Sequence, residues 1–277
     1  MKIGVIAESF RKSFEESVKK AASLGIDGLQ MYANTETVFA EMTKAQMKEV
    51  KKIIDGEGMA VSALCGDFGC DMYYTRDRAL IDREKKIMEL AKEFGTDVVT
   101  THIGVVSDDE TCRQYESMLE VCRELAEFAD SLQGHFAVET GPEKAVLLKG
   151  FLDKLNSRGV AVNLDPANLV MCAGDDPVQA VYTLKDYIVH THAKDGIQLK
   201  PFDTRRMYCP QHYGLEAIGW DNIKETPLGE GNVPWEKYLA ALKEIGYDGY
   251  LTIERECGET PENDIALAVN FLKKFNN

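Results

Sequence analysis

The chain has 277 residues, of which 44% are hydrophobic and 28% charged, with a formal net charge of −14 at pH 7 and an isoelectric point near 4.9. This length exceeds that of a simple domain but is ordinary for one α/β barrel. Strong negative charge opposes non-specific attraction to nucleic acid phosphates and to anionic membranes. The composition therefore argues against nucleic acid and membrane partners.

The start of the chain and its cysteines indicate a compartment. The first residues, Met-Lys-Ile-Gly-Val-Ile-Ala-Glu-Ser, lack the long apolar stretch of a signal peptide, and no later segment reaches membrane-spanning length. The seven cysteines are odd in number and scattered, without a Cys-x-x-Cys pair. Zinc-finger and disulfide frameworks are therefore not expected. We expect buried free thiols and a cytoplasmic location, where the environment is reducing.

Short β-rich runs alternate with amphipathic segments along the whole chain. The runs predict strands at 2–7, 27–32, 60–65, 97–103, 135–140, 160–165, 187–193 and 249–255. The amphipathic segments predict helices at 13–24, 43–57, 79–94, 110–132, 142–157, 176–186, 234–246 and 261–275. Eight βα units without a spare strand favour a closed (β/α)8 TIM barrel of the α/β class, with residues 1–277 as a single domain.

Three phrases of similar sequence mark joints where a helix passes into a strand. They are Leu-Gly-Ile-Asp-Gly-Leu at 24–29, Phe-Gly-Thr-Asp-Val-Val at 94–99 and Ile-Gly-Tyr-Asp-Gly-Tyr at 245–250. The first glycine of each suits the left-handed backbone conformation that ends a helix. Asn-Ser-Arg-Gly at 156–159 is expected to make a fourth joint of this kind.

One connection is much longer than the others. Residues 195–233, after the seventh predicted strand, are rich in Pro, Asp, Arg and aromatic residues. A long connection after a barrel strand usually lies over the active site, so we expect this loop to cover the site. No Gly-x-Gly-x-x-Gly follows the first strand and no Walker A sequence occurs, which disfavours nucleotide-binding folds.

Four of the predicted strands end on a group that can bind a hard metal ion. These groups are Glu139, Asp165, His192 and Glu254. The C-terminal ends of parallel barrel strands converge on one face, so the four side chains can meet there. Clustered carboxylates repel one another, and a divalent cation removes that cost. One imidazole with three carboxylates suits one divalent ion, Mn²⁺ or Mg²⁺ foremost, with Co²⁺ or Zn²⁺ also compatible.

Three further side chains belong to the same mouth of the barrel. Strand alternation places His190 on the face of His192 but one layer deeper, where a histidine satisfied by interior hydrogen bonds is the better interpretation than a ligand. His102 closes the fourth strand and is expected to contact substrate or to support the site. Asn168, three residues after Asp165, can reach a substrate hydroxyl, although a capping role is nearly as good an explanation.

The segment after the seventh strand adds three candidate substrate contacts. Lys194 can reach substrate if the strand has ended there. Arg205 could grip a phosphate or carboxylate of the substrate, and Trp220 could stack on a sugar face. A solvated loop held down by its aromatic residues explains Arg205 and Trp220 equally well.

Five motifs taken together resemble the xylose-isomerase-like TIM barrel superfamily, in particular its sugar phosphate isomerase/epimerase branch. The resemblance covers nearly the whole chain and rests on Glu139, Asp165-Pro-Ala-Asn168, His192-Ala-Lys-Asp195, Pro227-Leu-Gly-Glu-Gly231 and Ile253-Glu254. It implies that Glu139, Asp165, His192 and Glu254 bind one divalent ion. It also implies that Glu139 and Glu254 serve as the catalytic acid/base pair.

The sequence therefore predicts a metal-dependent isomerase or epimerase. Its substrate would be a small carbohydrate (a sugar, a sugar phosphate or an inosose), and the reaction would be proton transfer through a metal-stabilised enediolate. A dehydratase or lyase on a keto-sugar or inosose remains an alternative, as does a non-catalytic sugar-binding barrel or a subunit of a larger enzyme. A homo-oligomer is compatible with the sequence.

Two positions depart from the pattern of the ketose 3-epimerases in this superfamily. Those enzymes carry a further glutamate where this chain has Ala145, and they favour a histidine where it has Asn168. Both differences weigh against a direct assignment as a free-ketose 3-epimerase. The DNA-repair endonuclease relatives need extra Asp and His ligands in the stretch that is Ile-Lys-Glu-Thr-Pro at 223–227 here, which disfavours that activity.

Overall fold

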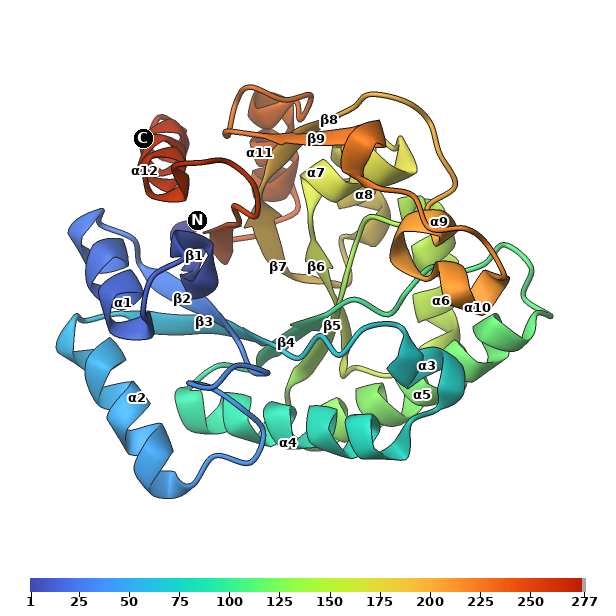
Figure 1. The fold of residues 1–277 in the computed structure, drawn as a ribbon, viewed down its shortest axis with the longest axis horizontal. Helices are drawn as coiled ribbons and strands as arrows, with labels where there is room; N and C mark the ends of the chain where they lie inside the picture. Colours follow the sequence, from blue (N-terminus) through green and yellow to red (C-terminus); the bar gives the residue numbers. More distant parts are fainter. Residues whose placement is uncertain (276–277) are drawn as a thin grey trace.

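The computed structural model describes residues 1–275 and contains the closed barrel that the sequence predicts (Figure 1). All neighbouring barrel strands run parallel, in the order β1-β10-β7-β6-β5-β4-β3-β2. The strands are β1 (Lys2–Ile6), β2 (Gly28–Tyr32), β3 (Ala60–Cys65), β4 (Val98–Thr101), β5 (His135–Glu139), β6 (Val160–Leu164), β7 (Ile188–Ala193) and β10 (Tyr250–Ile253). Each coincides with a predicted strand to within a few residues.

Helices surround the barrel as an outer layer (Figure 1). The eight that correspond to predicted helices are α1 (Phe14–Ser23), α2 (Lys44–Gly56), α4 (Arg78–Phe94), α5 (Arg113–Ser131), α6 (Ala145–Leu155), α8 (Pro177–Leu184), α11 (Trp235–Glu244) and α12 (Pro261–Lys273). Their apolar faces pack on the strands and form one continuous hydrophobic core. None of the helices within residues 1–275 combines the length and apolar character that crossing a membrane requires.

Local sequence explains where these helices begin and end. Ser13 and Glu16 form a reciprocal capping box at the start of α1, which satisfies backbone N–H groups that otherwise lack partners. Gly95 takes a left-handed φ of 83° at the end of α4, and the glycines of the two other predicted joints do likewise. At the fourth joint the left-handed residue is Asn156, with φ 48°, and not the glycine of that phrase.

The long connection after β7 is more ordered than the predicted loop. Strands β8 (Asp195–Gln198) and β9 (Ile223–Thr226) pair antiparallel, apart from the barrel. Between and beside them lie α9 (Arg205–Tyr208), α10 (Pro210–Tyr213) and η3 (Trp220–Asn222). The short elements η1 (Ala7–Phe10), α3 (Asp71–Thr75), α7 (Pro166–Asn168) and η2 (Leu169–Ala173) were also not predicted.

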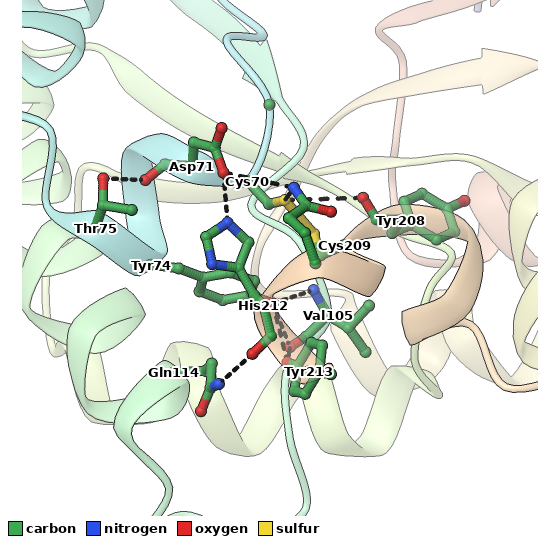
Figure 2. The surroundings of a disulfide bond; sticks show 12 residues. Cys70, Asp71, Tyr74, Thr75, Val105, Gln114, Tyr208, Cys209, His212 and Tyr213 are labelled. Atoms are coloured by element: carbon green, nitrogen blue, oxygen red, sulfur yellow. Dashed lines mark hydrogen bonds and ion pairs between the residues drawn. A yellow bond between two sulfur atoms is a disulfide. The ribbon is translucent and has the colours of Figure 1, made fainter. Parts of the chain in front are cut away.

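The expectation that no cysteines pair is wrong for two of them. Cys70, directly before α3, forms a disulfide with Cys209 between α9 and α10 (Figure 2). His212 of α10 points at the carboxylate of Asp71 beside this bond (Figure 2). The remaining five cysteines are free, and three of those are buried as expected. The disulfide therefore ties the connection after β7 to the segment that follows β3.

Candidate metal centre and substrate cavity

The four predicted ligands meet at the C-terminal mouth of the barrel. Glu139 ends β5, His192 lies in β7, and Asp165 and Glu254 directly follow β6 and β10. Each side chain offers one oxygen or nitrogen atom, and these atoms all lie within 4.8 Å of one another. All four residues are buried, with exposed fractions between 0% and 6%. The structure thus brings together the four side chains that the sequence predicted to converge from the strand ends.

His192 Nδ1 lies at the middle of this cluster. It is 3.0 Å from Glu254 Oε2, 3.4 Å from Asp165 Oδ2 and 3.5 Å from Glu139 Oε1. Burial would lower the pKa of His192, but the carboxylates of Glu139 and Glu254 outweigh it and hold that pKa well above its usual range. The negative charge of the carboxylates therefore demands a positive charge at this point.

Unpaired atoms indicate what kind of charge fits there. Asp165 Oδ2, His192 Nδ1 and Glu254 Oε2 are buried, face the centre of the cluster, and make no hydrogen bond, although Lys194 Nζ forms an ion pair with Glu254 Oε2. Buried polar atoms are normally satisfied, so three convergent atoms without a hydrogen bond are suited to share a cation, which would displace the proton of the imidazole. Three carboxylates and one imidazole are hard, oxygen-rich ligands of the kind Mn²⁺ and Mg²⁺ prefer. The donor set therefore fits a divalent metal ion.

Neighbouring amides hold the carboxylates of Glu139 and Asp165 in place. Asn163 Nδ2 donates to Glu139 Oε2 at 3.1 Å, and Asn168 Nδ2 donates to Glu139 Oε1 at 3.0 Å. The backbone N–H of Asn168 donates to Asp165 Oδ1 at 2.8 Å, which leaves Asp165 Oδ2 free for the centre. Such supporting hydrogen bonds orient ligands and fix which atom faces the metal.

His102 lies between two carboxylates. Its Nδ1 is 3.1 Å from Asp67 Oδ2 and its Nε2 is 3.4 Å from Glu139 Oε1. Burial would lower the pKa of His102, but Glu139 and Asp67 outweigh it and hold the pKa well above its usual range. Burial would likewise raise the pKa of Glu139, but the imidazoles of His102 and His192 hold it well below its usual range. Glu139 is thus ionised beside a charged His102.

The deeper histidine, His190, has hydrogen-bond partners for both ring nitrogens inside the barrel, as the sequence predicts. Its Nδ1 lies 2.9 Å from Asn163 Oδ1, and its Nε2 lies 2.9 Å from Thr252 Oγ1. Burial lowers the pKa of His190 to about 3, so the ring is neutral. His190 is therefore part of the polar layer beneath the cluster.

A cavity of about 690 Å³ opens above the cluster. His102, Asn168, Lys194 and Trp220, which the sequence singled out as substrate contacts, all line it together with Glu254. Lys194 follows the end of β7, and its Nζ is 3.2 Å from Glu254 Oε2. Burial would lower the pKa of Lys194, but Glu254 and Glu256 hold it well above the usual range, so the amine stays charged.

Arg205 is the one predicted contact that the structure does not bring to the cavity. Its guanidinium is held by Asp203, with Nη2 2.7 Å from Oδ2, and lies over the ring of Tyr213. The rest of the connection after β7 does form a wall of the cavity, through Tyr208, Cys209 and residues 220 and 223–225. This segment therefore borders the cavity above the candidate metal centre.

Sequence reasoning missed three residues that support the site. They are Gln30 in β2, Asp67 after β3 and Asn163 in β6. Asp67 follows a strand end, so the criterion that selected the ligands could have found it. Gln30 and Asn163 lie within strands, and only the barrel register brings them beside His192 and Glu139.

The fold corresponds to a known class of barrels. The family model described as "Xylose isomerase-like TIM barrel" matches residues 18–275, and the chain belongs to that family. A crystal structure of a xylose isomerase domain protein from Planctomyces limnophilus is 25% identical, with a TM-score of 0.75, and the match covers 93% of this chain and 90% of that one.

Two named enzymes are also similar. The inosose dehydratase of Lacticaseibacillus casei is 24% identical over 167 residues, which are 60% of this chain and 54% of that protein. The structure of D-psicose 3-epimerase with D-tagatose from Clostridium cellulolyticum H10 is 17% identical, with a TM-score of 0.74 and 99% of each chain covered. The second likeness shows the shared fold.

Proposed function

We propose that this protein is a divalent-metal-dependent isomerase or epimerase of a small carbohydrate. The observation that carries the proposal is the set of three buried atoms without a hydrogen bond, Asp165 Oδ2, His192 Nδ1 and Glu254 Oε2, beneath a cavity. Glu139, Asp165, His192 and Glu254 would hold the ion. When bound, it would supply Lewis acidity that makes a C–H beside the substrate carbonyl more acidic.

Glu254 is the residue best placed to move that proton. It lines the cavity, and its Oε2 faces both the cluster and Lys194 Nζ. Lys194 remains charged, and its ammonium forms an ion pair with the Glu254 carboxylate. A carboxylate at hydrogen-bond reach of a carbon acid is suited to general base catalysis.

Glu139 is the second acid/base group, and it acts from behind the cavity wall. Its Oε1 contacts Asn168 Nδ2 and His102 Nε2, and both of those residues line the cavity. The charged His102 can donate a proton to substrate and take one back from solvent through the cavity, while the carboxylates of Glu139 and Asp67 hold the ring and favour its charged form. Epimerisation and isomerisation both follow from one group removing a proton and another returning it.

A dehydratase is the second candidate. The likeness to an inosose dehydratase over 167 residues favours it. Proton removal by Glu254 is common to both reactions, and expulsion of a β-hydroxyl in place of reprotonation would give dehydration. His102 is the acid available to protonate that leaving hydroxyl.

The test is proton exchange with solvent. Protein loaded with Mn²⁺ is incubated in D₂O with free ketoses, aldoses and inososes, and each compound is followed by ¹H NMR. We expect deuterium at the carbon beside the carbonyl, and no exchange with chelator-treated protein. Product that forms without deuterium at that carbon would rule out proton transfer, and loss of the β-hydroxyl would select the dehydratase.

A further inference from the structure

The cavity is larger than a single sugar ring requires. Its volume of about 690 Å³ lies within the range of pockets that enclose ligands of drug size. A six-membered ring in contact with Glu254, His102 and Asn168 would fill only the part next to the cluster. The remaining space has a different lining.

Apolar side chains from three segments form the wall of that remaining space. They are Met171 and Cys172 of η2, Tyr208 of α9, Trp220 of η3 and Ile223 of β9. Tyr208 Oη donates to Cys172 Sγ at 3.5 Å. Strand β8 links the other two segments, because its Gln198 donates from Nε2 to Met171 O at 3.0 Å and pairs with Ile223 of β9. The wall is thus a continuous part of the fold and not a set of unconnected side chains.

Trp220 stands at the edge of this wall. Its exposed fraction of 69% is high for so large an apolar side chain, although the residue lines the cavity. Exposed tryptophan at the mouth of a pocket offers a flat surface for a planar or apolar ligand group. Because the indole is not packed into the core, its position is not explained by stability.

The charged groups around the cavity offer little to an anionic ligand group at this wall. None of the described residues that line the cavity is an arginine, and Arg205 is engaged by Asp203. The lining has four carboxylates, from Asp67, Glu225, Glu254 and Glu256, and three cationic groups, from Lys194, Lys224 and the charged His102. Lys194 is already paired with Glu254 and Glu256, and His102 with Asp67 and Glu139. A phosphate at this wall would therefore find no bidentate arginine partner.

We propose that the wall formed by Met171, Cys172, Tyr208, Trp220 and Ile223 is a second subsite, which binds an uncharged planar group attached to the sugar. The substrate class is then a glycoside whose sugar ring carries a carbonyl and whose aglycone is aromatic or similarly flat and apolar, in preference to a free monosaccharide or a sugar phosphate. The sugar lies toward Glu254, and the aglycone lies against Tyr208 and Trp220. This inference rests on the proposed function of the metal centre.

Calorimetric titration of the Mn²⁺-loaded protein tests the subsite. The ligands are phenyl β-D-glucopyranoside and phenyl β-D-galactopyranoside, their methyl counterparts, and glucose 6-phosphate. Burial of a phenyl ring should lower Kd at least about tenfold relative to the methyl glycoside of the same sugar. Glucose 6-phosphate should bind more weakly than either phenyl glycoside.

Two variants test whether the preference for phenyl over methyl glycosides arises at this wall. Trp220→Ala should reduce the ratio of methyl to phenyl Kd from about tenfold to about twofold or less, since half or more of the ring contact is lost. Leu267→Ala, which truncates another exposed apolar side chain (56% exposed) outside the cavity lining, should keep the full ratio. Equal binding of phenyl and methyl glycosides, no binding of any glycoside, tighter binding of glucose 6-phosphate, or an unchanged ratio in Trp220→Ala would each overturn the subsite.

Failure of the subsite and failure of the proposed function give different results. A phenyl preference without deuterium exchange on any carbonyl sugar would keep the subsite and overturn the isomerase. Exchange on free sugars without a phenyl preference would keep the reaction and overturn the subsite.

Discussion

The side-chain amide of Gln30 in β2 reaches across the barrel interior to His192 in β7, with 3.0 Å between Gln30 Oε1 and His192 Nε2. Gln30 Nε2 donates at the same time to Thr100 Oγ1 at 3.2 Å, which orients the amide. The amide oxygen therefore accepts the proton of Nε2, so that Nδ1 is the nitrogen that faces Asp165 and Glu254 and the one from which a bound cation would displace the proton. Gln30 selects the form of His192 that can bind a metal.

Replacing Gln30 by alanine should therefore weaken metal binding. We expect the Kd for Mn²⁺ to rise about 10–100-fold, as for other residues that orient a histidine ligand. Titration of Mn²⁺ followed by calorimetry measures the change, with circular dichroism to verify the fold. Gln179→Ala, an exposed glutamine on α8, is the matched control and should leave the Kd unchanged. An unchanged Kd in Gln30→Ala would contradict the role assigned to Gln30.

The buried carboxyl of Glu143 makes the free energy of unfolding depend on pH. Its carboxyl is buried and accepts the backbone N–H of Val106 at 3.0 Å. Burial raises the pKa of Glu143 to about 8, so the folded protein holds a proton that the unfolded chain has released at neutral pH. The contribution of Glu143 to the free energy of unfolding is therefore complete below the ordinary carboxyl pKa, and it is lost as the pH rises toward 8.

Glu143→Gln should remove that pH dependence, because the amide keeps an acceptor for Val106 and carries no charge. We expect the variant to equal the wild type in free energy of unfolding near pH 4 and to exceed it by a few kcal/mol at pH 8. Urea unfolding at several pH values measures the difference. Glu244→Gln, on the exposed side of α11, should follow the wild-type curve. A wild-type profile in Glu143→Gln would show that Glu143 is not protonated in the fold.

The disulfide between Cys70 and Cys209 closes a loop with a sequence separation of 139. Cross-linking residues that far apart restricts the unfolded chain, which stabilises a protein by about 2–5 kcal/mol. Cys209→Ser should therefore lower the free energy of unfolding by that amount without reductant, and the difference should vanish in dithiothreitol. Cys257→Ser, which removes an exposed free thiol, should have no such effect. Seven reactive thiols in the denatured, unreduced wild type would contradict the pairing.

The barrel was predictable because its signals are local. A cap such as Ser13 with Glu16, and a glycine such as Gly95 in the left-handed region, each mark a helix end within a few residues. Strand ends carry the ligands, so knowing the strands of a closed parallel barrel was enough to bring Glu139 and Glu254 to the same face. The substrate and the reaction leave no comparable local signal.

The unpredicted features depend on contacts between distant segments. Strand β8 is four residues long, and its partner β9 begins only at Ile223, so neither shows a pattern of its own. Cys70 and Cys209 pair because the barrel closes, which their spacing does not reveal. Arg205 turns to Asp203, two residues away, where a sequence motif cannot show the direction of a side chain.

Glu254 is the position at which the proposed reaction is most directly tested. Its Oε2 lies 3.0 Å from His192 Nδ1 and 3.2 Å from Lys194 Nζ, and the residue lines the cavity. Glu254→Gln keeps the size of the side chain but removes both the charge that binds metal and the group that takes a proton. We expect the fold to be retained and turnover to fall at least about a hundredfold.

Asn168→Ala separates that effect from a loss of substrate contact. Asn168 Nδ2 donates to Glu139 Oε1 and lines the cavity, so its removal should raise KM more than it lowers kcat. Both variants are assayed at saturating Mn²⁺ on the compound that exchanges deuterium, with the metal content measured in each sample. If Glu254→Gln turned over normally, or lost activity only until more Mn²⁺ was added, Glu254 would be a ligand at most and the proton would have to be moved by Glu139 through His102.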